Sequence, residues 1–131
     1  MKRYFFKRIL FVLLLFSCVA CEEKDFYSTL EDDQAEMSSL RKEIDKLAGQ
    51  LSCSDASDWK FTAIGVKACG GPTGYVAYST KIDEALLLKK VALYTQKQKA
   101  FNVKWGASSD CMFLSPPKSI SCVGGKPEFV Y

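Results

Sequence analysis

The clearest apolar pattern along the chain begins at Leu30. Apolar side chains then recur at spacings of three, four or seven, as in the a and d positions of a heptad repeat: Leu30, Met37, Leu40, Ile44, Leu47 and Leu51. Asp33 occupies the first d position and breaks the seam. We therefore predict a coiled-coil-like helical stalk over residues 30–52 and a homo-oligomer that forms through residues 30–51. The alternatives are a spacer, or one amphipathic helix that lays its apolar stripe on the rest of the protein.

A second helical stripe predicts a long helix over residues 83–104. Asp83 or Ser79 is suited to cap its start, and Gly106 to end it. The stripe consists of Leu87, Val91, Tyr94, Gln98, Phe101 and Trp105, of which only Gln98 is strongly polar. A stripe of this kind is typical of a surface helix that packs on a sheet.

Segments rich in β-branched and aromatic residues predict the strands of that sheet. They are residues 59–66, 75–78 and 111–114, followed by one last strand or by a hairpin that turns at Gly124 and Gly125. Tyr75 and Tyr78 are three residues apart and therefore belong to opposite faces of their strand. The predicted fold class is α+β, with a small antiparallel sheet of three to four strands, one long packed helix and the preceding helical stalk.

Residues 1–20 have the layout of a signal peptide. A basic cluster precedes an apolar run from Ile9 to Phe16, and short residues lead up to Cys21. The run is shorter than the roughly 20 apolar residues that a membrane-spanning helix needs. We predict a signal peptide at 1–20, a tether at 21–29, the stalk, and a folded head over 53–131.

The end of this signal resembles the lipobox of bacterial lipoproteins, in which a cysteine after small residues becomes the lipidated first residue. Val19 and Ala20 precede Cys21 as the motif prefers, and Cys18 is the alternative lipidation site. The mostly acidic run 22–25 is similar to the surface-export signal of Bacteroidetes-type lipoproteins. The resemblance implies a lipid anchor in the outer membrane at the cell surface, and the alternatives are a periplasm-facing or a secreted protein.

The four remaining cysteines, Cys53, Cys69, Cys111 and Cys122, predict two structural disulfides in a small exported head. Four cysteines allow three pairings, and the sequence does not choose among them. The chain has no histidine, and these four cysteines form no CxxC motif, so we predict no metal site and no cofactor.

Charge divides the chain at the start of the head. Residues 22–52 carry nine acidic and four basic side chains, whereas residues 53–131 carry six acidic and ten basic ones. The basic side chains of the head are all lysines without an aromatic–basic repeat, so we expect no nucleic-acid partner. Lys89, Lys90 and Lys97 are candidate binding residues for a protein or a polyanionic envelope polymer, and a solvated face is the alternative.

The sequence predicts no catalytic residues. Without histidine the usual base for a serine nucleophile is missing. The acidic residues of the head lack the spacing of a calcium loop, and a head of this size rarely encloses a glycosidase cleft. The run from Cys69 to Pro72 precedes a predicted strand rather than a helix, so we interpret it as a tight turn and not as a phosphate loop.

The pattern of Cys69–Pro72, Tyr75, Tyr78, Ser109–Cys111, Pro116–Pro117 and Cys122 resembles a family of small exported bacterial proteins of unknown function. That resemblance implies a shared disulfide-stapled fold and no particular activity. We predict a non-enzymatic, lipid-anchored surface protein whose head binds another macromolecule. The alternative is an inhibitor or immunity-type lipoprotein that blocks an envelope hydrolase.

Overall fold

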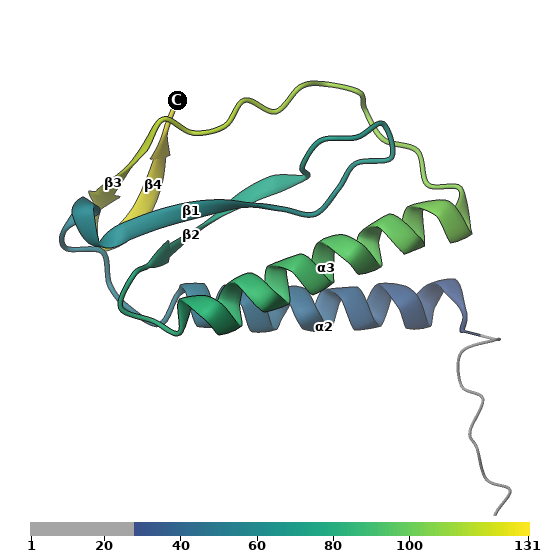
Figure 1. Cartoon of the computed structure of the whole chain (residues 1–131), viewed down its shortest axis with the longest axis horizontal. Helices are drawn as coiled ribbons and strands as arrows, with labels where there is room; N and C mark the ends of the chain where they lie inside the picture. Colours follow the sequence, from purple (N-terminus) through teal and green to yellow (C-terminus); the bar gives the residue numbers. More distant parts are fainter. Residues whose placement is uncertain (1–27) are drawn as a thin grey trace, which may run out of the picture.

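The computed structural model describes residues 28–131 and has an α+β fold, as predicted (Figure 1). Its elements, in chain order, are α2 (Leu30–Ala48), the 3-10 turn η1 (Ala56–Asp58), β1 (Trp59–Ile64), β2 (Gly74–Ser79), α3 (Glu84–Trp105), β3 (Ser119–Val123) and β4 (Lys126–Val130). The predicted signal peptide, both candidate lipidation sites and most of the predicted tether lie outside the described residues.

The four strands form two separate antiparallel hairpins, so the predicted single sheet of three to four strands is wrong. β1 pairs with β2 along its whole length, and β3 pairs with β4. The expected hairpin turn is confirmed at Gly124 and Gly125, whose φ angles are 57° and 78°. Two consecutive positive φ angles are what a two-residue type I′ turn requires, and glycine adopts them without strain.

Residues 111–114, predicted as a strand, belong instead to an irregular segment between α3 and β3. Pro116 and Pro117 follow this segment, and proline cannot donate to a strand ladder. The Cys69–Cys111 disulfide attaches the segment to the β1–β2 loop. An apolar run forms a strand only where a partner edge is available, and the segment pairs with no strand of the described chain.

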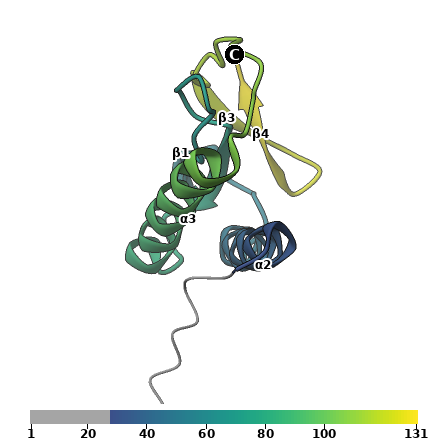
Figure 2. The same cartoon turned by 90° about the vertical axis from the view of Figure 1, so that its right-hand side faces the viewer.

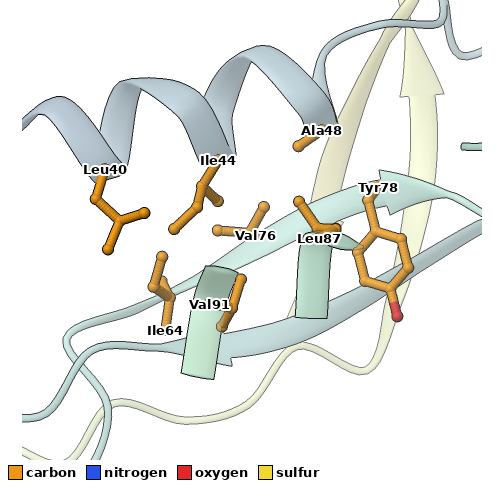
Figure 3. Packing of buried hydrophobic residues seen from close by; sticks show 8 residues of the cluster. All are labelled: Leu40, Ile44, Ala48, Ile64, Val76, Tyr78, Leu87 and Val91. Carbon is orange, nitrogen blue, oxygen red and sulfur yellow. The ribbon is translucent and has the colours of Figure 1, made fainter. Parts of the chain in front are cut away.

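Helix α2 packs against the rest of the fold, so residues 30–52 do not form a free-standing stalk. Leu40, Ile44 and Ala48 are only 8%, 0% and 6% exposed and share one core cluster with residues of β1, β2 and α3 (Figure 3). The alternative prediction, an amphipathic helix with its stripe on the head, therefore describes the structure. An isolated two-stranded hairpin is at best marginally stable in water, and here residues of both helices complete its core.

The core cluster consists of Leu40, Ile44, Ala48, Ile64, Val76, Tyr78, Leu87 and Val91. Figures 1 and 2 show α2 and α3 side by side under one face of the β1–β2 hairpin. Lys104 at the end of α3 donates to Ser28, just before the start of α2, so the two helices run antiparallel. The two N-termini of the helices therefore lie at opposite ends of the fold.

The caps of both helices are encoded locally. Thr29 and Asp32 form a capping box at the start of α2, in which each side chain accepts from the other residue's backbone N–H. Asp83 caps α3 by accepting from the N–H of Leu86, and Gly106 ends it in the left-handed region with φ 60°. These caps place α3 within one or two residues of its predicted bounds.

The β3–β4 hairpin meets the other face of β1–β2. Tyr75 lies on this face, whereas Tyr78 points into the helical core with 3% exposure, so the predicted division of the two tyrosines is confirmed. The ring of Phe129 in β4 contacts Phe61 and Tyr75 edge-on, with centroid distances of 6.1 and 6.5 Å. Edge-to-face aromatic pairs at these distances are favourable and join the two hairpins.

Candidate functional site

The three lysines predicted to bind a partner do not form one free patch. Lys90 pairs with Glu43 of α2 at 2.6 Å, and Lys97 pairs with Glu36 of α2 at 2.9 Å. Lys89 is exposed on another side of α3. Since residues 90 and 97 are seven apart, they face the same side of the helix, and that side meets α2. Two of the three lysines therefore join the helices together.

The four cysteines of the head form the two predicted disulfides, and the structure supplies the pairing that the sequence left open. Cys53 pairs with Cys122, which connects the segment after α2 to β3. Cys69 pairs with Cys111, which connects the β1–β2 loop to the segment after α3. Both bonds join segments far apart in sequence, and such cross-links commonly stabilise a small domain by about 2–4 kcal/mol each.

A groove of about 590 Å³ runs beside β2, between the C-terminal half of α2 and strand β4. Arg41 and Asp45 line it from α2, residues 75–77 line it from β2, and Lys126 and Phe129 line it from β4. Its volume is within the range of roughly 300–1,000 Å³ that is usual for binding pockets. The groove was not predicted from the sequence.

The backbone of β2 has a free edge along this groove. Thr80 donates its N–H to the carbonyl of Asp58 at 2.7 Å, which sets the phase of the β1–β2 ladder. In an antiparallel ladder alternate residue pairs exchange hydrogen bonds, so the pairs 60/78, 62/76 and 64/74 do so here. The N–H and C=O groups of Tyr75 and Ala77 consequently point away from β1. No backbone group elsewhere in the described chain 28–131 bonds to them.

The two walls of the groove differ in chemistry. On the α2 side Arg41 and Asp45 form an ion pair of 3.0 Å. On the β4 side Tyr75 and Phe129 present aromatic rings. Side chains of a strand placed along β2 alternate between these two walls. The groove therefore favours an extended segment in which apolar and polar residues alternate.

A second polar cluster lies on the helical face of the hairpin. The hydroxyl of Tyr78 donates to Glu84 at 3.0 Å, and Lys60 donates to the same carboxylate at 3.1 Å. Burial, with the bond to Glu84, raises the pKa of Tyr78 to about 12. The hydrogen bond from Lys60 lowers the pKa of Glu84. Both pKa shifts keep the Tyr78 phenol neutral and the Glu84 carboxylate ionised near neutral pH, so neither group is poised for proton transfer there. The hydrogen bonds of the cluster connect α3 to the β1–β2 hairpin.

Most acidic residues of the head have structural contacts. Asp55 and Asp83 cap η1 and α3, while Asp58 and Asp110 pair with Lys81 and Lys67. Within residues 28–131 there is no group of three or more side chains suited to hold a metal ion. The same residues contain no helix long and apolar enough to cross a bilayer.

One sequence signal pointed toward the groove without revealing it. The sequence predicts Tyr75 on the strand face opposite to Tyr78, which lies in the core. A tyrosine on the face away from the core commonly packs against another element or a ligand. The free edge itself depends on how many strands the sheet has, and that number was predicted incorrectly. Comparison with protein-family models, with curated proteins and with solved structures finds no match to this chain.

Proposed function

We propose that this chain is a non-enzymatic surface lipoprotein, anchored in the outer membrane through Cys21, whose folded part binds an extended peptide segment of another protein along β2. The free backbone edge of Tyr75 and Ala77 inside the groove is the observation that supports the binding role. Unpaired strand edges bind extended peptides through main-chain hydrogen bonds, and flanking pockets select the side chains.

The contacts favour a peptide over a polyanionic polymer. A polyanion needs free cationic side chains, and Lys90 and Lys97 already pair with Glu43 and Glu36. The groove offers backbone donors, backbone acceptors and aromatic rings, which together match an extended peptide. The partner segment therefore places apolar side chains toward Tyr75 and Phe129 and polar ones toward the Arg41–Asp45 pair.

The lipid anchor has a direct test. Intact mass spectrometry of the membrane fraction should find a diacyl or triacyl modification on Cys21, and protease shaving of whole cells should remove the protein. A modified Cys18 would move the anchor, and a soluble, unmodified chain that begins after Ala20 would reject it.

The peptide site has an independent test. A displayed library of random linear dodecapeptides is selected on the immobilised mature chain, and the affinities of the recovered peptides are then measured. We expect Ala77→Pro to abolish this binding, because proline removes the outward N–H and disturbs the edge. The N–H of Ala77 does not bond to β1, so the hairpin should survive the change.

Ala63→Pro is the matched control. Ala63 lies opposite Tyr75 in the ladder, and its N–H points away from β2 at the other edge of the hairpin. This variant should retain peptide binding if the site is the β2 groove. Recovered peptides that bind Ala77→Pro as well as the unmodified chain, or a loss with Ala63→Pro alone, would refute the proposed site.

A further inference from the structure

The most exposed large apolar side chains of the described chain gather near one end. Phe113, Val103 and Met112 are 83%, 80% and 74% exposed, more than any other large apolar side chain in residues 28–131. Trp105, at 37% exposed, belongs to the same end of α3. We call these four residues the apolar tip. Single exposed apolar residues are common on protein surfaces, but several such residues at one end mark an interaction site.

Hydrogen bonds connect the parts of the apolar tip to one another. Asn102, beside Val103, donates to the carbonyl of Val66 at 2.9 Å. The next residue, Lys67, donates to the carbonyl of Met112 at 3.0 Å. The end of α3, the start of the β1–β2 loop and the segment around residue 112 therefore lie together.

The chain enters the described structure at this same end. Lys104 donates to the hydroxyl and carbonyl of Ser28, and Trp105 donates to Asp33 in the first turn of α2. In Figure 1 the start of α2, the end of α3 and the beginning of the loop after it lie on the right-hand side, and Figure 2 is viewed from that side. Only six residues separate Cys21 from Ser28. An extended chain of this length spans at most about 25 Å.

We infer that the apolar tip rests in the surface of the lipid bilayer and holds the folded residues 28–131 in one orientation. The β3–β4 turn then points away from the membrane. This inference relies on the proposed anchor at Cys21, because the short connection brings this end close to the lipid. Apolar and aromatic side chains such as those of the apolar tip insert into the interfacial region of a bilayer. The β2 groove is then free for a partner outside the cell.

Depth-dependent fluorescence quenching tests this orientation. Residues 21–131, which include every described residue, are coupled through the Cys21 thiol to a maleimide lipid in phosphatidylcholine vesicles. In a background with Trp59→Phe and Trp105→Phe, the variant Phe113→Trp places one reporter in the apolar tip. The matched variant Val123→Trp places it at an exposed apolar position, 51% exposed, beside the opposite hairpin turn.

Brominated phosphatidylcholine should strongly reduce the fluorescence of Phe113→Trp and leave that of Val123→Trp nearly unchanged. Adding Val103→Ser and Met112→Ser should restore much of the lost fluorescence of Phe113→Trp, with thermal unfolding checked for each variant. Equal quenching of both reporters, or none at Phe113→Trp, would overturn the inference. Because the coupling is chemical, failure of the natural anchor appears separately in the intact mass of the cellular protein, and failure of the peptide site appears only in the Ala77→Pro assay.

Discussion

The carboxylate of Asp33 in α2 accepts a hydrogen bond of 2.9 Å from the indole N–H of Trp105 at the end of α3. Lys104 donates to the same carboxylate oxygen at 2.8 Å and lies over the Trp105 ring at 4.7 Å. Asp33 is the residue that breaks the apolar heptad pattern. Its polarity is explained by this contact, which connects the first turn of one helix to the last turn of the other.

We expect Asp33 to make stability depend on pH in the acid range. The bonds from Lys104 and Trp105 lower its pKa from 3.8 to about 2. A depressed folded-state pKa contributes stability above the unfolded pKa, and this contribution is lost as pH falls from about 4 to about 2. Urea unfolding across this range should show a steeper loss for the unmodified chain than for Asp33→Asn. Glu31→Gln removes the same charge from the same turn and is the control; an equal change with this variant would contradict the assignment.

Ile44 should be essential to the fold, because it is fully buried between the helices and the sheet. Ile44→Ala is expected to lower the free energy of unfolding by about 2–5 kcal/mol, the usual cost of truncating a buried aliphatic side chain. Lys42→Ala, on the exposed side of α2, should change it by less than about 0.5 kcal/mol. Denaturant titration followed by circular dichroism measures both. Similar values for the two variants would mean that α2 is detached in solution.

Gln98 should hold the start of the β1–β2 loop against α3. Its side-chain oxygen accepts from the N–H of Val66 at 2.8 Å, and the neighbouring Thr95 hydroxyl accepts from Gly65 at 3.0 Å. Gln98→Ala leaves a partly buried donor without its partner, at a cost of about 1–3 kcal/mol. Amide exchange at Val66 should become faster in this variant. Gln96→Ala, on an exposed position of the same helix, is expected to leave that exchange rate unchanged.

Both disulfides should be present in the mature protein. Peptide mapping without reduction should recover Cys53 linked to Cys122 and Cys69 linked to Cys111. Replacing either pair by serines is expected to cost about 2–5 kcal/mol, as for native disulfides of small exported domains. Free thiols, or either of the other two pairings, would contradict the structure.

The sequence alone predicted the elements whose signals are local. Caps at Asp83 and Gly106 define α3 within its own segment, and two glycines encode the β3–β4 turn. The apolar period of three and four likewise identified α2 as an amphipathic helix. The oxidised state of four cysteines followed from their even number and the predicted export, but their pairing needs the distances between segments 42 and 69 residues apart.

Tertiary structure decided what each apolar face contacts. A heptad stripe packs equally well on a second copy or on the same chain. Ile44 is buried within one molecule because the β1–β2 hairpin and α3 present an apolar face to α2. The same holds for residues 111–114, which form a short apolar run but have no partner edge in the described chain. The free edge of β2 and the gathering of Val103, Met112 and Phe113 near the entry of the chain exist only in the folded protein. Such sites combine segments that no local pattern relates, because their contacts are made across the whole length of the fold.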